Sequence, residues 1–275
     1  MVILKLREKY EIPIEADNIS PDIFWDKSRS EIEDLPLYYG NKEKKLGEVF
    51  EVEGEKSDQI YIEGDLSKIK KIGFGMSRGK ISIKGNVGLH LGALMKGGEI
   101  FVEGDVDSWA GAEMSGGLIR IKGNAGNRVG GIYRGTPAGM NRGTILVEGN
   151  AGYEVGGFMR RGLIVILGNV GDFTGVHMIA GTILVFGTLG ARTGAGMRRG
   201  TIIAFKPVSL LPTFKYDTTY TPDFLKVYFH FLKKQGISIP EGYFLGPYKR
   251  YHGDISELGK GEILEFQNES EPKRT

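Results

Sequence analysis

The sequence contains 275 residues, carries a formal net charge of +2 and has no cysteine. A charge so close to balance gives no reason to expect a nucleic-acid partner or an anionic membrane surface, and no apolar run is long enough to span a bilayer. The lack of cysteine excludes disulfides, thiolate nucleophiles and cysteine-bound iron–sulfur clusters in this chain, and we expect a cytoplasmic location.

Residues 1–57 are expected to form an N-terminal cap. The segment Met1–Glu8 alternates apolar and charged residues, which predicts a first strand rather than a signal peptide. A short helix or turn is predicted around Glu31–Leu35, closed by Pro36. A cap is needed because the end of a repeat array would otherwise expose unpaired backbone groups and apolar rows.

Residues 58–206 contain one short unit written seven times. Its clearest copy is Gly73–Gly85, with the pattern Gly-x-x-Met-x-x-Gly-x-Ile-x-Ile/Val-x-Gly. Every methionine except Met1 is in register: Met76, Met95, Met114, Met140, Met159, Met178 and Met197. They are 19 residues apart, except that 26 residues separate Met114 from Met140, so this unit carries an insertion of seven. A period near 20 residues indicates a repeat architecture.

Each unit is predicted to be a strand followed by a tight corner. The Ile-x-Ile/Val segments alternate apolar with polar or mixed residues, which is the period of a strand with one buried face. Gly-Asn or Gly-Asp follows, for example at Gly104-Asp105 and Gly123-Asn124. The glycine is expected to supply a positive φ, and the Asn or Asp to hydrogen-bond the backbone.

These features predict an all-β chain, and specifically a right-handed parallel β-helix. We expect about seven to eight coils of 19 residues, each paired with the next ~4.8 Å along the axis, with methionine rows inside and Asn rows at a corner. A meander of hairpins fits less well, because the turns recur identically rather than in pairs.

Residues 207–275 are expected to form a C-terminal cap or extension with one helix. The helix is predicted from Pro222 to Gln235, capped by Thr221 and ended by Gly236. Its apolar residues cover more than one face of the helix. The helix therefore either plugs the end of the solenoid, which we favour, or lies in a subunit interface. A last strand is expected at Glu262–Phe266.

No catalytic, cofactor-binding or metal-binding residues are predicted. The four histidines lie in unrelated settings, without His-x-His or His-Glu-x-x-His spacing. Stacking would instead align basic residues just after the repeat methionines: Arg78, Lys96, Arg142, Arg160, Arg161, Arg198 and Arg199. The candidate partner contacts are Tyr133 and Arg134 of the insertion with Arg142, Arg160, Arg161, Arg198 and Arg199. The alternative is a solvated edge and a tolerated surface loop.

The methionine-containing repeat, the segments Asn18-Ile-Ser-Pro21 and Leu46–Gly54, and the long extension after residue 206 carry a family resemblance. Over nearly the whole chain they resemble the C subunit of formylmethanofuran dehydrogenase. More broadly the chain is similar to the C-terminal β-helix domain of the glutamate synthase large subunit, and to one component of the formyltransferase/hydrolase complex of methylotrophs.

This resemblance implies a non-catalytic structural subunit of a multisubunit oxidoreductase. In that family the complex reduces CO2 to formate and condenses it with methanofuran to give N-formylmethanofuran, a first step of methanogenesis. The implied partners are a subunit holding a tungsto- or molybdopterin, an amidohydrolase-like subunit with a dinuclear metal site, and ferredoxin-type subunits with iron–sulfur clusters. None of these cofactors is expected on this chain.

Other functions stay open. The chain would also suit a scaffold role in a formyltransferase/hydrolase complex, or a glutamate-synthase-like module, although the catalytic domains of the latter are not fused here. A free-standing β-helix enzyme acting on polysaccharide would need clustered Asp and Glu on a strand face. The acidic residues here fall singly at corners and coil ends.

Overall fold

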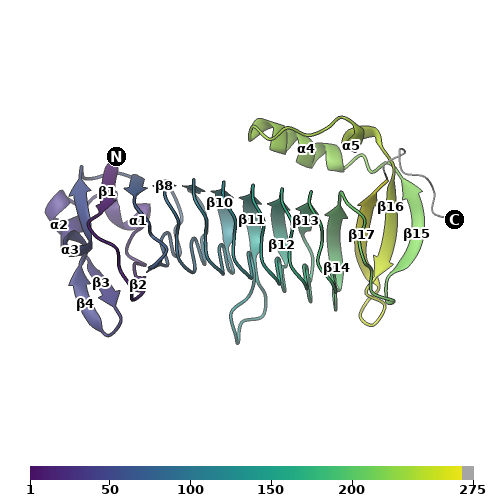
Figure 1. The fold of residues 1–275 in the computed structure, drawn as a ribbon, viewed down its shortest axis with the longest axis horizontal. Coiled ribbons are helices and arrows are strands. Elements are labelled where there is room, and N and C mark those ends of the chain that lie inside the picture. The colour runs from purple at the N-terminus through teal and green to yellow at the C-terminus, as the bar shows by residue number, and fades with distance from the viewer. Residues whose placement is uncertain (268–275) are drawn as a thin grey trace.

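A computed structural model of the chain describes residues 1–267 and shows a mostly β protein, as predicted. Thirteen strands form one long sheet, and four strands form a small second sheet near the N-terminus. In Figure 1 the repeats stack side by side along the long axis, with the N-terminal segment at one end and the C-terminal strands at the other.

The centre of the long sheet consists of β6 (Gln59–Glu63), which precedes the first repeat, and one strand from each of the seven repeats. The repeat strands are β8 (Lys80–Lys84), β9 (Glu99–Val102), β10 (Ser115–Ile121), β11 (Asn141–Val147), β12 (Arg161–Ile166), β13 (Thr182–Val185) and β14 (Arg199–Ala204). Each pairs in parallel with its equivalent in the next repeat, so that Ile81 lies beside Ile100 and Ile100 beside Ile119. A second column of five parallel bridges joins successive coils from Leu66 to Val170.

The methionine row lies inside the stack, as predicted. All seven repeat methionines have 0% of their surface exposed, and they share one core with the strand isoleucines. Their flexible side chains reach into gaps that glycines leave open. The Cε atom of Met159, for instance, lies 2.9 Å from where a Cβ on Gly181 would be.

The corner row of Asn and Asp forms a hydrogen-bond ladder, which confirms that part of the prediction. The Oδ1 atom of Asn86 accepts from the N–H of Asp105 at 2.9 Å, and Asp105 Oδ1 accepts from the N–H of Asn124 at 2.6 Å. The ladder continues through Asn150 and Asn169 to the N–H of Thr188. Each side chain thus satisfies a backbone donor one repeat further along the chain.

The expected reason for the corner glycines is wrong at four of the six corners. Gly64 and Gly85 do have positive φ (138° and 147°), but Gly104, Gly123, Gly149 and Gly168 are not in the left-handed region. Glycine is needed there because the corners stack closely. A Cβ on Gly104 would lie 2.5 Å from the carbonyl oxygen of Gly85.

The N-terminal segment covers one end of the stack. Strand β1 (Val2–Leu6), which was predicted, joins the long sheet between β5 (Phe50–Glu53) and β6. The small sheet contains β2 (Ile14–Glu15), β3 (Pro36–Tyr39), β4 (Lys42–Lys45) and β7 (Ile69–Lys70), and the helices are α1 (Pro21–Phe24), α2 (Arg29–Glu33) and α3 (Leu46–Val49). Helix α2 begins earlier than predicted because Ser28 and Glu31 form a capping box.

The C-terminal strands close the other end of the sheet. Strand β17 (Lys260–Phe266) pairs in parallel with β14, and β16 (Tyr248–Gly253) and β15 (Lys215–Tyr220) follow in antiparallel order. The predicted strand at Glu262–Phe266 is confirmed as part of β17. Helices α4 (Leu225–Lys234) and α5 (Gly242–Leu245) lie between β15 and β16 in the sequence.

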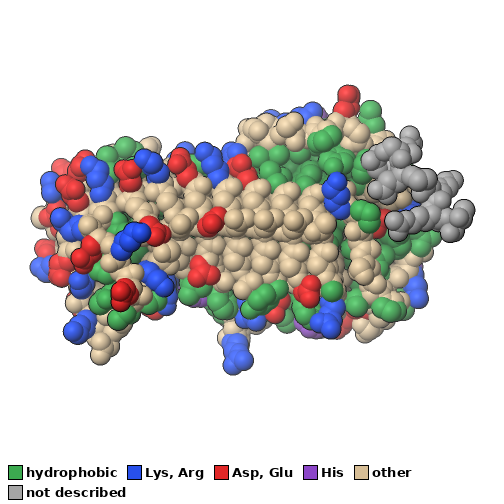
Figure 2. Space-filling model, in the orientation of Figure 1, with side chains coloured by type: hydrophobic (Ala, Val, Ile, Leu, Met, Phe, Trp, Pro, Cys, Tyr) green, Lys and Arg blue, Asp and Glu red, His purple; other side chains and the backbone are tan. Residues whose placement is uncertain are grey.

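The prediction that the C-terminal helix plugs the end of the stack is wrong. Helix α4 lies along the outer face of the long sheet (Figure 1), where Phe229 and Leu232 belong to a second core with Leu184 and Ile203. In Figure 2 hydrophobic side chains fill the space between this helix and the stack. Strands β12 and β13 are therefore buried on both faces over their apolar runs, Leu163–Ile166 and Ile183–Val185.

The predicted start of this helix is also wrong. The helix begins after Phe224 without a side-chain cap, and Pro222 and Asp223 form a preceding turn. The hydroxyl of Thr221 donates instead to the carbonyl oxygen of Leu245, at 3.4 Å.

Candidate functional site

One edge of the stack displays large side chains from residues with left-handed backbone. The residue two positions before the first glycine of each unit has positive φ: Lys71, His90, Trp109, Arg128, Glu154, Phe173 and Arg192. In the unit with the insertion this glycine is Gly130, and the insertion follows it. Such conformations are costly for residues other than glycine, so the stacking must hold them. The N–H of His90, for example, donates to the carbonyl oxygen of Ser108 in the next repeat, at 3.0 Å.

Neighbouring side chains along this edge contact one another. The rings of His90 and Trp109 are 5.3 Å apart, and the guanidinium of Arg128 lies 5.3 Å from the Trp109 ring centre. Arg128 also pairs with Glu154, whose Oε2 is 2.8 Å from Arg128 Nε. Sequence reasoning missed this edge. Its only signal is a bulky residue at a fixed place in each repeat, which reveals nothing about backbone handedness.

The seven-residue insertion projects from this edge and is held in place by earlier repeats. Tyr133 Oη lies 2.7 Å from His90 Nδ1, and the N–H of Tyr133 donates to Glu113 Oε1 at 2.7 Å. The hydroxyl of Thr136 donates to the same carboxylate oxygen at 2.5 Å. Just after the insertion (residues 131–137), the N–H of Gly139 donates to the carbonyl oxygen of Phe158 in the next repeat, at 2.9 Å. The insertion is thus anchored to earlier units, and the residue that follows its end pairs with the next unit.

The hydrogen-bonded pair at the base of the insertion is half-buried. Burial, with a smaller contribution from the charge of Glu113, raises the pKa of Tyr133 to about 12. Burial also lowers the pKa of His90, and the positive charges of Lys71 and Lys70 lower it further. Both groups therefore favour their neutral forms, which suits a structural contact.

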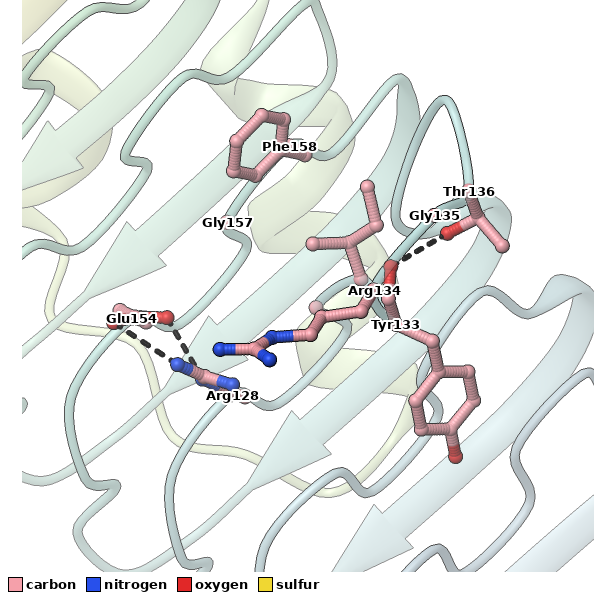
Figure 3. A pocket seen from close by; sticks show the side chains of 10 residues that line it. Arg128, Tyr133, Arg134, Gly135, Thr136, Glu154, Gly157 and Phe158 are labelled. Carbon is pink, nitrogen blue, oxygen red and sulfur yellow. Dashed lines mark hydrogen bonds and ion pairs between the residues drawn. The ribbon is translucent and has the colours of Figure 1, made fainter.

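A pocket of about 330 Å³ lies between the insertion and the next repeat. Its walls include Arg128, Tyr133, Arg134, Glu154 and Phe158 (Figure 3). Arg134 is exposed, and its side chain extends toward Arg128 and Glu154 in this view. The pocket contains two guanidinium groups and one carboxylate, so its walls carry one excess positive charge.

The other sequence-predicted contacts divide into paired and unpaired residues. Arg198 lies 3.3 Å from Glu257 in the C-terminal segment, and Arg78, at the other end of the row, lies 3.8 Å from Asp22 and over the Trp25 ring. Among residues 1–267 no ion pair involves four exposed members of the row: Arg142, Arg160, Arg161 and Arg199.

The structure does not bring the whole predicted set into one site. Arg134 lines the pocket and the arginine row lies near the starts of the strands, whereas the Tyr133 hydroxyl is directed toward His90. In Figure 2 Lys and Arg side chains lie along both edges of the stack, mixed with acidic and hydrophobic side chains.

Residues 1–267 contain neither a cluster of metal-binding side chains nor a membrane-spanning helix. No group of three or more His, Cys, Asp or Glu side chains there is arranged to hold a metal ion. No helix in the same stretch combines the length and hydrophobicity that a membrane crossing requires.

The pattern that defines the GXGXG motif family matches residues 59–213. The chain belongs to the GXGXG motif family.

The predicted resemblance to the C subunit of formylmethanofuran dehydrogenase is confirmed. The C subunit of tungsten-containing formylmethanofuran dehydrogenase 2 from Methanothermobacter marburgensis is 47% identical over 97 residues, which are 34% of this chain and 36% of that protein. The C subunit of molybdenum-containing formylmethanofuran dehydrogenase 1 from Methanothermobacter thermautotrophicus is 49% identical over 92 residues, or 33% and 23% of the two chains.

The match therefore spans only about a third of the first of these relatives and less of the second. A solved structure is similar over a much greater length. It is a chain of the formyltransferase/hydrolase complex FhcABCD from Methylorubrum extorquens, determined in complex with methylofuran. It is 36% identical, has a TM-score of 0.90, and the match covers 97% of this chain and 100% of that one.

Proposed function

We propose that this chain is a non-catalytic structural subunit of a formylmethanofuran dehydrogenase complex. Such a complex would reversibly reduce CO2 and condense it with methanofuran to N-formylmethanofuran. The observation that carries the proposal is the match over almost the whole chain to one chain of a multisubunit complex. The shorter matches to the C subunits of the tungsten and molybdenum enzymes favour the dehydrogenase over other complexes.

The scaffold role rests on a fold that we infer to be a right-handed parallel β-helix at 58–206. Its support is the parallel pairing of every repeat with the next and the two columns of bridges along the stack. Residues 1–57 would act as the N-terminal cap and 207–275 as the C-terminal extension. A stack whose core is closely packed along its length is stiff, which suits a subunit that holds others in register.

The chemistry would belong to partner subunits. These would be a pterin-metal subunit with tungsten or molybdenum, an amidohydrolase-like subunit with a dinuclear metal site, and ferredoxin-type subunits with iron–sulfur clusters. The cysteine-free sequence supplies no thiolate for any of these centres. As part of the same proposal, the complex is cytoplasmic.

The contact surface would be the exposed arginine row of Arg142, Arg160, Arg161 and Arg199. Arg161 and Arg199 are the first residues of β12 and β14, Arg160 directly precedes β12, and Arg142 is the second residue of β11. The stacking of the repeats would bring them along one side. Unpaired arginines on a rigid edge suit an acidic partner surface, since complementary charge promotes specific docking. Tyr133, Arg134 and Arg198 would contribute through the insertion and through the contact with Glu257.

The experiment is anaerobic purification of the native chain, with copurifying subunits and metals identified by mass. A pterin-metal subunit together with an amidohydrolase-like subunit would support the proposal, whereas purification of the chain alone would contradict it. The match to FhcABCD favours a formyltransferase/hydrolase complex as the second candidate. That candidate requires an amidohydrolase-like subunit and a formyltransferase subunit without tungsten or molybdenum.

The docking surface is tested separately by the double charge reversal Arg160→Glu/Arg161→Glu. A Lys9→Glu/Lys42→Glu variant is the matched control, because both lysines are exposed, lie outside the row and give the same change in net charge. We expect the first variant to lose partner subunits on size-exclusion chromatography and the control to keep them. Equal retention would contradict the contact assignment.

A further inference from the structure

The pocket beside the insertion has an unbalanced set of charges. Arg128 and Arg134 both line it, and Glu154 is the single acidic residue in its walls. Glu113 lies nearby but is not part of the walls, and its Oε1 is occupied by the N–H of Tyr133 and the hydroxyl of Thr136. One guanidinium is therefore left without a counter-charge inside the pocket.

Arg128 is the arginine already engaged. Its guanidinium lies over the ring of Trp109, and its Nε is 2.8 Å from Glu154 Oε2. The Nε–H of Arg128 is buried and forms no hydrogen bond of good geometry among the described residues, so a ligand in the pocket does not reach it. Glu154 neutralises Arg128, and Arg134 is the arginine left for a ligand.

Arg134 is the second arginine of the pocket. No ion pair among residues 1–267 involves it, although its side chain extends over the pocket toward Arg128 and Glu154 (Figure 3). Its backbone is presented by an anchored loop, because Tyr133 on one side and Thr136 on the other are both bound to Glu113. Little ordering of the main chain is therefore needed before a ligand binds.

The remaining walls are largely apolar. Ile132 and Phe158 line the pocket together with several glycines. A volume of about 330 Å³ is at the lower end of the range for small-molecule sites. The pocket therefore fits a small anionic group attached to an apolar body.

We propose that this pocket binds a singly charged carboxylate, with the fork of Arg134 on its oxygens and its apolar body against Phe158. Planar guanidinium groups pair with carboxylates through two parallel hydrogen bonds. A phosphate dianion fits less well, because the walls have one excess positive charge and Glu154 would repel the second negative charge. The carboxylate could come from a free small organic acid or from an Asp or Glu side chain of a partner protein.

The test uses the purified full-length chain. Benzoate is titrated by calorimetry, with benzamide as the neutral analogue of the same shape and inorganic phosphate as the competing anion. Fluorescence of Trp109 in a Trp25→Phe background reports binding locally, because Arg128 connects the Trp109 ring to the pocket. Arg134→Gln removes the proposed fork, and Lys42→Gln is the control, because Lys42 is exposed, does not line the pocket and lies outside the proposed contact surface.

The expected result is saturable benzoate binding that weakens at least tenfold in Arg134→Gln, is unchanged in Lys42→Gln, and is absent for benzamide. If benzoate does not bind but Arg134→Gln weakens assembly with copurified partners while Lys42→Gln does not, the carboxylate belongs to a partner side chain. Phosphate binding as tight as benzoate binding would overturn the ligand class. No effect of Arg134→Gln on either ligand or assembly would overturn the site. The ligand arm needs no partner, so it can succeed or fail independently of the scaffold proposal.

Discussion

Asn124 Oδ1 accepts a hydrogen bond from the backbone N–H of Asn150, at 2.9 Å, although 26 residues separate the two. Every other rung of this corner ladder joins residues 19 apart. The extra seven residues leave the stack as a loop before the strand of their unit begins, so the corners on both sides stay in register. An insertion can thus add a surface feature without disturbing the core.

The ladder makes Asn124→Ala a test of its contribution to stability. The change removes the acceptor for the Asn150 N–H and the donor to Asp105 Oδ1. We expect the free energy of unfolding to fall by about 1 kcal/mol, the usual net value of such hydrogen bonds. Asn41→Ala is the control, because Asn41 is exposed and makes no side-chain hydrogen bond within residues 1–267. Identical urea midpoints for the two variants would show that the ladder adds nothing.

The corner glycines are predicted to resist substitution because of contact rather than backbone angle. A Cβ in Gly104→Ala would lie 2.6 Å from Asn86 Oδ1 and closer still to the Gly85 carbonyl oxygen. We expect a loss of about 2–3 kcal/mol from this overpacking. Gly242→Ala is the matched change, since no atom lies within 4 Å of the new Cβ. It should be neutral or slightly stabilising in the same denaturation experiment.

The methionine row predicts a large cost for truncation. Met159 has 0% of its surface exposed, so Met159→Ala should lower the free energy of unfolding by about 2–5 kcal/mol. Met159→Leu keeps the volume and should cost less than about 1.5 kcal/mol. Thermal melts and urea titrations of the two variants should separate clearly, and similar values would mean that the cavity collapses.

The packing of helix α4 against the outer face of the long sheet is predicted to contribute to the stability of the fold. Phe229 is fully buried against Phe205 and neighbouring residues, and Phe229→Ala should cost about 3–5 kcal/mol. Val227 lies on the same helix with 70% of its surface exposed, so Val227→Ala should change stability by less than about 0.5 kcal/mol. Equal effects would place the helix away from the sheet in solution.

His90 predicts a dependence of stability on pH. Burial and the charges of Lys71 and Lys70 lower its pKa in the folded protein below the ordinary value of 6.5, while Glu15 and Asp107 oppose the shift. Between the folded and the ordinary pKa the unfolded chain binds more protons, so stability falls as the pH drops below about 6.5. No penalty from this residue applies above that pH.

The measurement is chemical denaturation at pH 7.5 and at pH 5 for the natural chain and for His90→Asn. Asparagine tolerates the left-handed backbone that His90 adopts (φ 66°) and does not titrate. The natural chain should lose more stability than the variant on acidification. A loss of equal size would show that other groups, such as Glu15, control the response.

The sequence by itself determined the repeat, the strands and the inward face. The methionines and isoleucines recur every 19 residues, so the same side chains must stack wherever one unit pairs with the next. The Asn row followed from the same logic. These features depend on local periodicity, which a single sequence displays directly.

Only the tertiary structure decided which outer surfaces are covered and which are exposed. Helix α4 folds back along the sheet because its apolar side chains meet Leu184 and Ile203, residues more than 20 positions away in the sequence. The left-handed edge and its pocket likewise depend on backbone angles that neighbouring repeats impose on His90, Trp109 and Arg128. Residue type predicts such angles poorly, because non-glycine residues adopt them only when the surrounding contacts compensate for the strain.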